Sequence, residues 1–162
     1  MKKWLFLFVL LNAVWLLFTW SLKPADLIAG AIVSLIISLV LRDVFDDDMV
    51  KLLHPVRLFW SIIYIPIFFY YMIVANFDVA YRVLNPGMPI NPGIVKVKTN
   101  LKTDMGKTLL ANSITLTPGT LTVDIDNEYL YIHWINVLSE DVEKASKEIV
   151  HKFEKYIERI YG

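Results

Sequence analysis

The sequence lacks cysteine and glutamine entirely, and its charges cancel, with 16 Lys and Arg against 16 Asp and Glu. Without cysteine the chain has no disulfide, no thiolate zinc site, no cysteine nucleophile and no cysteine-ligated iron–sulfur cluster. Zero net charge argues against nucleic-acid binding, because that affinity comes from clustered Lys and Arg. The patterns GxGxxG, Walker A, HExxH and GxSxG are also absent. The joint loss of Gln and Cys, both thermolabile, is a tendency of hyperthermophiles.

Apolar residues make up 56% of the 162 residues and the mean hydropathy is +0.51, which indicates a membrane protein. The charges are unevenly distributed: residues 1–92 carry 7 basic and 6 acidic residues, and residues 93–162 carry 9 and 10. Proline and glycine gather between residues 86 and 93, as they do at domain boundaries. We therefore expect a transmembrane region over residues 1–92 and an extramembrane domain over residues 93–162.

Three apolar runs predict three helices in the first region. They are Trp4–Trp20, Leu27–Leu41 and a run from Leu58 that stays apolar to Val74 and continues to Leu84. A helix from residue 58 to residue 84 would be about 40 Å long, more than a bilayer core requires, so its end should lie at the interface. Pro66 predicts a kink. The expected fold class is a membrane α-helical region, its third helix kinked and partly interfacial, followed by a small α+β domain.

A stripe of small residues recurs every four positions in the second run: Gly30, Ser34 and Ser38, with Asp26 before it and Arg42 after it. Small residues at this spacing let another helix approach closely in lipid. We favour a helix-packing role for the three small residues, with the two charges at the membrane surfaces. The alternative is an ion path between Asp26 and Arg42.

Two further groups of charges flank the third run. Asp78 and Arg82 are four residues apart in the order that stabilises a helix, but they become candidates for an ion-path or coupling role if they lie within the membrane. Four aspartates lie within residues 43–48, without the glycine and terminal glutamate of an EF-hand. We interpret them as a solvated loop and predict no metal site.

The C-terminal domain is expected to have the order βαββα. The strands are Ile94–Lys98, Leu121–Ile125 and Tyr129–Ile135, and the first helix begins at Asp104 as its cap. A single last helix is capped by Ser139 and buries one apolar face. His133 has no neighbouring ligand in sequence and is interpreted as a packed strand residue. The members of the apolar face are Val142, Ala145, Ile149, Phe153, Tyr156 and Ile160.

The turn between the first helix and the second strand contains Thr115, Thr117, Pro118, Gly119 and Thr120. Proline and glycine in its middle suit a type II turn. Its backbone N–H groups could bind an anion, but no Lys or Arg lies within the turn, so we favour a structural role.

The segment LLANSITLTPGTLTVDI (Leu109–Ile125) resembles the signature of the E subunit of Mrp-type multisubunit Na⁺/H⁺ antiporters. The segments VAYRVLNPG (Val79–Gly87), PGIVKV (Pro92–Val97) and YIHWINV (Tyr131–Val137) extend the resemblance over essentially the whole chain. It implies an accessory membrane subunit, also built into archaeal membrane-bound hydrogenases and sulfur-reducing complexes, in which large antiporter-like subunits move the ions. The family supplies no catalytic residue and no cofactor to carry over.

The resulting hypothesis is a non-catalytic accessory subunit of a monovalent cation/proton antiporter, with other membrane subunits and the lipid bilayer as partners. The alternative is a membrane-anchored domain that binds a soluble ligand. The resemblance implies a cytoplasmic C-terminal domain. Three spans with Lys2 and Lys3 inside would instead place that domain outside, so the charges require either an outer N-terminus or a third run that does not cross.

Overall fold

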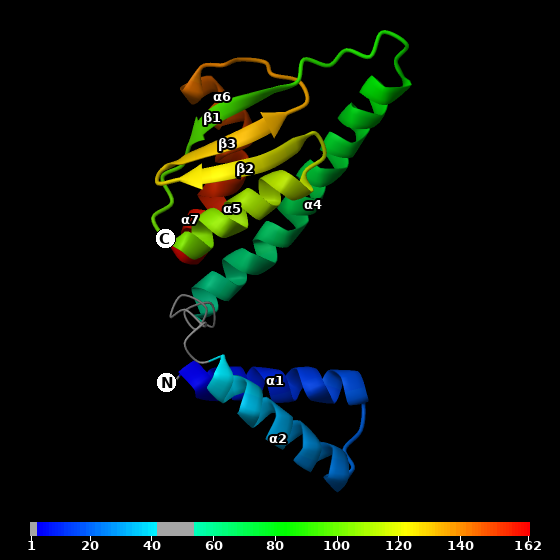
Figure 1. Ribbon diagram of the computed structural model, residues 1–162, viewed down its shortest axis with the longest axis vertical. Coiled ribbons are helices and arrows are strands. Elements are labelled where there is room, and N and C mark those ends of the chain that lie inside the picture. Colours follow the sequence, from blue (N-terminus) through cyan, green and yellow to red (C-terminus); the bar gives the residue numbers. More distant parts are fainter. Residues whose placement is uncertain (1–2, 42–53) are drawn as a thin grey trace. The chain divides into compact units, whose positions relative to one another are not determined.

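A computed structural model describes residues 3–41 and 54–162 (Figure 1). By their internal contacts the residues form two compact units, Met1–Leu53 and His54–Gly162, which we describe separately. The described residues are mostly helical and include a three-stranded antiparallel sheet. The acidic cluster at residues 43–48 and Arg42 lie outside the described residues.

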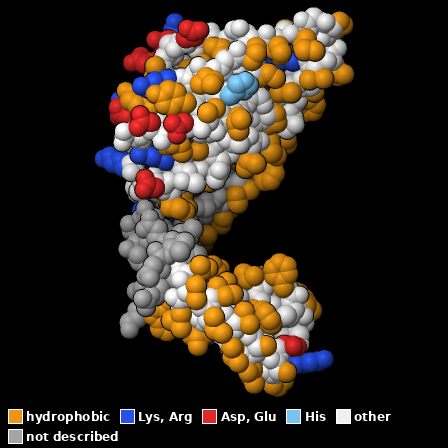
Figure 2. Space-filling view, in the orientation of Figure 1, with side chains coloured by type: hydrophobic (Ala, Val, Ile, Leu, Met, Phe, Trp, Pro, Cys, Tyr) orange, Lys and Arg blue, Asp and Glu red, His pale blue; other side chains and the backbone are white. Residues whose placement is uncertain are grey.

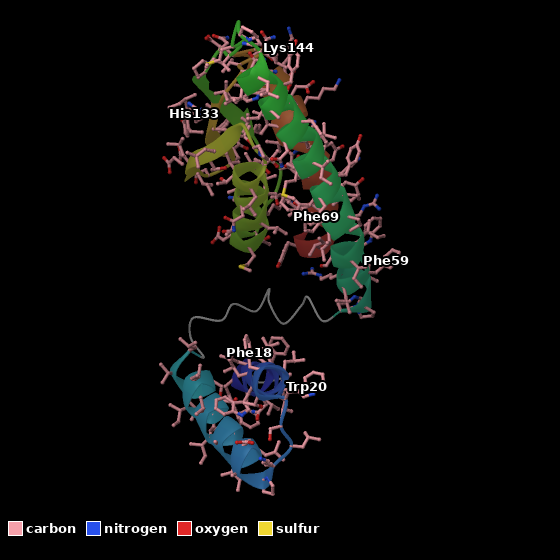
Figure 3. The ribbon with its side chains drawn as sticks, turned by 90° about the vertical axis from the view of Figure 1, so that its right-hand side faces the viewer. Phe18, Trp20, Phe59, Phe69, His133 and Lys144 are labelled. Atoms are coloured by element: carbon pink, nitrogen blue, oxygen red, sulfur yellow. The ribbon has the colours of Figure 1, made fainter. Side chains whose placement is uncertain are left out.

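The first unit is a hairpin of two apolar helices, α1 (Lys3–Thr19) and α2 (Pro24–Val40). Pro24 stands at the first turn of α2, where its missing N–H is not needed. The Trp15 indole N–H donates to the carbonyl oxygen of Asp26 at 3.0 Å and so fastens α1 to the start of α2. Large hydrophobic side chains cover the surface of the pair, including Phe18 and Trp20 (Figures 2 and 3). Such a surface is stable in lipid rather than in water.

The second unit begins with α4 (Pro55–Leu84), a 30-residue helix that continues through Pro66. Among the described residues it is the one helix long and apolar enough to cross a membrane; α1 and α2 are apolar but shorter. It ends at Leu84, and the extended backbone of the next residue, Asn85, is the conformation favoured before Pro86.

The sheet consists of β1 (Gly93–Lys98), β2 (Thr120–Asp126) and β3 (Tyr129–Trp134) in the order β1-β3-β2. Ile94 pairs with His133, and Leu121 pairs with His133 from the other side. Asn127, with φ of 54°, makes the tight turn between β2 and β3. One face of the sheet forms the core through alternate residues, and helices cover that face. The buried strand residues are Val95, Val97, Leu130 and Ile132.

Three helices complete this layer: α5 (Asp104–Leu116), α6 (Val142–Ile149) and α7 (His151–Tyr161). The single last helix of the prediction is thus two helices that meet at Val150. The N–H groups of Phe153 and Glu154 both donate to the Val150 carbonyl oxygen, a tightened turn that keeps Val150 itself fully buried.

Three local predictions were wrong. The cap of α5 is Thr103, whose hydroxyl accepts from the Gly106 N–H at 3.2 Å, and not Asp104. The cap of α6 is Asp141, which accepts from the Lys144 N–H at 3.0 Å, and not Ser139. His133 is exposed on the outer face of the sheet, because the register places Leu130 and Ile132 on the inner face.

Helix α4 packs against the sheet domain through an aromatic cluster. Phe153 of α7 lies with its ring centroid 6.4 Å from that of Tyr64, 6.3 Å from that of Phe68 and 5.6 Å from that of Tyr71. The Ser113 hydroxyl donates to the Leu109 carbonyl oxygen, so the buried Tyr64 hydroxyl donates to Ser113, 2.5 Å away. This packing explains why α4 belongs to the second unit. The division into a transmembrane region up to residue 92 and an extramembrane domain after it stays a prediction.

Candidate functional site

The small-residue stripe of α2 is buried within the hairpin. Gly30, Ser34 and Ser38 are the buried residues of this helix. A Cβ at Gly30 would lie 2.5 Å from Cδ1 of Trp15, so only glycine lets α2 approach α1 this closely. The Ser38 hydroxyl donates to the Leu35 carbonyl oxygen within its own helix, so it is satisfied without a ligand.

Asp26 lies at the start of α2 and is half-buried. Its carboxylate accepts from the Ser21 hydroxyl at 2.5 Å, and its position in the first turn complements the helix dipole. The Asp26 carboxylate therefore has the contacts expected of a residue that stabilises the start of a helix. Because Arg42 lies outside the described residues, the ion path between the two residues stays a hypothesis.

Asp78 and Arg82 form an ion pair on α4. The Arg82 Nε lies 2.8 Å from the Asp78 Oδ2, and a second bond of 3.1 Å makes the pair bidentate. The Arg82 Nη1 also donates to the Pro89 carbonyl oxygen at 2.6 Å. When the Asn136 side-chain amide is oriented with its oxygen towards Arg82, that oxygen accepts from both Arg82 Nη atoms at 3.3 Å. Arg82 therefore fastens the end of α4 to the segment that leads into β1 and to the segment after β3.

The threonine hydroxyls of the signature turn are used within the fold. Thr117 donates to the Ser113 carbonyl oxygen at 2.7 Å, and Thr120 donates to the Ile114 carbonyl oxygen at 2.7 Å. The Thr115 hydroxyl accepts from the Thr122 N–H at 3.1 Å. These bonds hold the end of α5 against the start of β2, which supports a structural role for the turn over an anion site.

Gly119 in this turn adopts φ of +90°, and a Cβ there would lie 2.9 Å from Ile135 Cγ2 and 3.3 Å from Val79 Cγ2. Pro118 precedes it, as expected for a type II turn. We predict that Gly119→Ala lowers the free energy of unfolding by about 1–3 kcal/mol, because a Cβ disfavours this backbone region and crowds Ile135.

The measurement is denaturant unfolding of the full chain in mild detergent. Gly87→Ala is the matched control, because a Cβ at Gly87 would meet only Asn85 Oδ1, at 3.4 Å. Equal stability of the two variants would show that the Gly119 backbone is not constrained.

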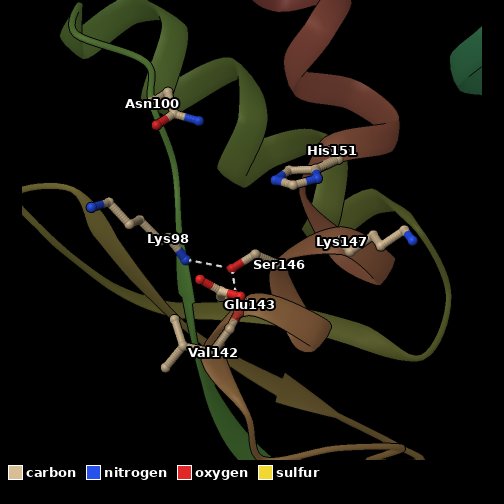
Figure 4. A pocket seen from close by; sticks show the side chains of 7 residues that line it. All are labelled: Lys98, Asn100, Val142, Glu143, Ser146, Lys147 and His151. Atoms are coloured by element: carbon tan, nitrogen blue, oxygen red, sulfur yellow. Dashed lines mark hydrogen bonds between the residues drawn. The ribbon is translucent and has the colours of Figure 1, made fainter.

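A polar depression between the end of β1 and α6 is shallow, with a volume of about 370 Å³ (Figure 4). The Ser146 hydroxyl at its centre already accepts from the Lys98 N–H at 2.8 Å and donates to the Val142 carbonyl oxygen at 2.6 Å. Within residues 3–41 and 54–162, no group of three His, Cys, Asp or Glu residues could hold a metal ion. The remaining lining residues are Asn100, Glu143, Lys147 and His151.

Two buried polar contacts were not predicted. The Glu154 carboxylate accepts from the Thr99 hydroxyl and from the Asn100 N–H, each at 2.6 Å, and so joins α7 to the end of β1. Lys152 lies over the Tyr71 ring at 5.6 Å, and burial lowers the pKa of its ammonium group while the charge of Glu148 opposes that shift. The one sequence signal was that Glu154 follows Phe153 directly, close to the apolar face of α7.

Comparison with known proteins identifies relatives that match almost the full length of the chain. Residues 8–160 match the family model described as Na⁺/H⁺ ion antiporter subunit (MNHE). The E subunit of a Na(+)/H(+) antiporter of Alkalihalophilus pseudofirmus is 43% identical over 156 residues, which cover 92% of this chain and 94% of the relative. The corresponding Bacillus subtilis protein is 37% identical over 161 residues, covering 94% and 96%.

A solved structure has the same fold. It is a chain of the membrane-bound sulfane sulfur reductase, an archaeal respiratory membrane complex. The two chains are 48% identical and superpose with a TM-score of 0.86, over 99% of this chain and 100% of that one.

Proposed function

The chain belongs to the Na⁺/H⁺ ion antiporter subunit family, and we propose that it is a non-catalytic accessory subunit of a multisubunit monovalent cation/proton antiporter module. The observation that carries the proposal is identity of 43% and 37% with two named antiporter subunits over almost the whole of each chain. The 48% identity with a chain of the sulfane sulfur reductase supports the same role within an archaeal respiratory complex. The proposed partners are the other membrane subunits and the lipid bilayer.

The proposed contribution is assembly and support of ion translocation, rather than an ion path of its own. Arg82 and Asp78 neutralise each other, and the Asp26 carboxylate is held by Ser21 at a helix end. The hydroxyls of the signature turn are bonded to the protein backbone. These contacts favour structural roles for the charged and hydroxylic candidates, and the ion-path hypothesis becomes the second choice.

The proposed location is the cell membrane, as a multi-pass protein with the C-terminal domain in the cytoplasm. Helices α1 and α2 have 17 residues each, about 26 Å, a few Å less than the core of a typical bilayer and at the lower end of the length that a crossing helix needs. Their outward faces are apolar. A self-contained ligand-binding domain is less favoured, because the hydroxyl in the polar depression is already bonded to the backbone.

Purification of the tagged full chain in mild detergent should recover several other membrane subunits with it. The same preparation from cells that express the tag on an unrelated two-helix membrane protein is the control. A homogeneous monomer that transports Na⁺ alone in liposomes would contradict the proposal.

A further inference from the structure

We propose that α4 does not cross the bilayer but lies along the membrane surface, with its apolar face in the lipid and the sheet domain on its other side. This placement of α4 goes beyond the proposed function. It rests on the proposed function in one respect, which is that α1 and α2 cross the bilayer. Four observations carry it: the length of the contact with the domain, the composition of the free face, the cations beside it, and the distribution of charge along the chain.

The contact between α4 and the sheet domain extends over most of the helix. Near its start, the Arg57 Nη2 donates to the Gly162 carbonyl oxygen at 3.1 Å. Near its end, a Cβ on Gly119 would reach Val79 Cγ2 at 3.3 Å. The helix rises about 33 Å between residues 57 and 79, while a bilayer core is about 30 Å thick. A crossing α4 would therefore pull the domain into the hydrocarbon along with it.

The cost of such a crossing follows from the charges of α7, the helix of the domain that packs on α4. Lys152, Lys155, Glu158 and Arg159 all lie on α7. Each charged side chain at the centre of a bilayer carries a large free-energy penalty, and four such penalties together are comparable to the whole stability of a domain. The domain therefore stays outside the lipid core, and α4 stays with it.

The face of α4 that turns away from the domain is apolar along its length. No charged residue occurs between Leu58 and Ala75. Figure 2 shows hydrophobic side chains along the α4 edge of this unit, and Figure 3 views the unit from that side. An apolar surface of this length is not left in water. The exposed side chains include Phe59, Ile62, Ile65, Phe69, Ile73 and Phe77.

Cations border this apolar face and identify the lipid surface as the occupant. The Arg159 guanidinium lies 4.1 Å from the centre of the Trp60 ring, and the Lys155 ammonium lies 4.8 Å from that of Tyr156. Lys152 lies over Tyr71 of α4 in the same way. Long basic side chains that rest on aromatic rings beside an apolar face place their charge at the level of phospholipid headgroups.

The placement also resolves the orientation of the chain. If only α1 and α2 cross, then the N-terminus, residues 42–57 and the sheet domain share one side of the membrane. Lys23 is then the one basic residue on the other side, while Lys2, Lys3, Arg42, Lys51 and Arg57 accompany the domain. The positive-inside rule and a cytoplasmic domain then agree, which three crossings would not allow.

The test uses single cysteines, since the natural chain has none to remove. Val56→Cys and Leu84→Cys place thiols at exposed positions near the two ends of α4, and Lys23→Cys marks the turn between α1 and α2. The full chain in sealed membrane vesicles of both orientations is treated with a membrane-impermeant maleimide. We expect residues 56 and 84 to react from the same side and residue 23 from the opposite side.

Labelling of residues 56 and 84 from opposite sides would overturn the proposal. Labelling of residue 23 from the same side as both ends of α4 would instead refute the crossing of α1 and α2, so the two failures are distinguishable. For the occupant, a fluorophore on Ile62→Cys or Phe69→Cys should be quenched by brominated phospholipids, while one on the exposed Asn112→Cys of α5 should not. Unquenched labels at both residues 62 and 69 would show that a protein covers this face and would also overturn the proposal.

Discussion

Replacing Phe153 by alanine should lower the free energy of unfolding of the second unit by about 3–5 kcal/mol. Phe153 is fully buried and contacts three aromatic rings of α4, those of Tyr64, Phe68 and Tyr71. Its removal leaves a cavity at the junction of α4 and α7, where the surrounding rings are too rigid to fill the space. The loss of stability is therefore larger than the loss caused by removing a single methylene group from the core.

The measurement is chemical unfolding of the purified full chain in mild detergent, followed by circular dichroism. Phe69→Ala is the matched control, since it removes the same atoms from an α4 position that is 49% exposed. We expect that control to change the stability by less than about 1 kcal/mol. A Phe153→Ala variant as stable as the control would show that α4 is not held to the domain by this cluster.

Gly30→Leu should separate α1 from α2. The Cβ alone would lie 2.5 Å from Cδ1 and 2.7 Å from Nε1 of Trp15, so the helices must move apart to admit the side chain. Movement would also strain the bond from the Trp15 indole to the Asp26 carbonyl oxygen. Overpacking of this kind costs about 1–3 kcal/mol, which corresponds to about 5- to 150-fold in the equilibrium between packed and separated helices.

The effect can be measured as resistance of the full chain to unfolding by SDS, together with the amount of chain found in the membrane. Ala29→Leu adds the same side chain one position earlier, where the helix is exposed, and should leave both quantities unchanged. Equal SDS resistance of the two leucine variants would refute close packing at Gly30.

Local patterns in the sequence predicted the elements of the fold well. The apolar runs gave α1, α2 and α4 to within a few residues, because a helix that exposes a surface to lipid must be apolar along that surface. Alternation gave the three strands, since one face of this sheet is buried. The caps were misplaced by one or two residues, because several polar residues precede each helix and the sequence does not select among them.

The contacts of the candidate site residues likewise divide into those that are local in the sequence and those that are not. The pairing of Asp78 with Arg82 is local and could be predicted from a spacing of four residues. The further partners of Arg82 are the Pro89 carbonyl oxygen and Asn136, and Asn136 is 54 residues away, so no periodicity could have indicated it. The bond between Tyr64 and Ser113 is non-local in the same sense.

The sequence by itself indicated a membrane protein and most of the helices and strands, because composition, apolar run length and alternation are properties of neighbouring residues. The family was indicated separately, by the resemblance of residues 109–125 and three further segments to the antiporter E subunit. Only the tertiary structure decided which face of α4 packs on the domain and which face is left exposed. Phe153, Ser113 and Arg159 attach the domain along this 30-residue helix, and they lie far from it in the sequence, so no local pattern could have indicated the contact on which the proposed placement of α4 rests.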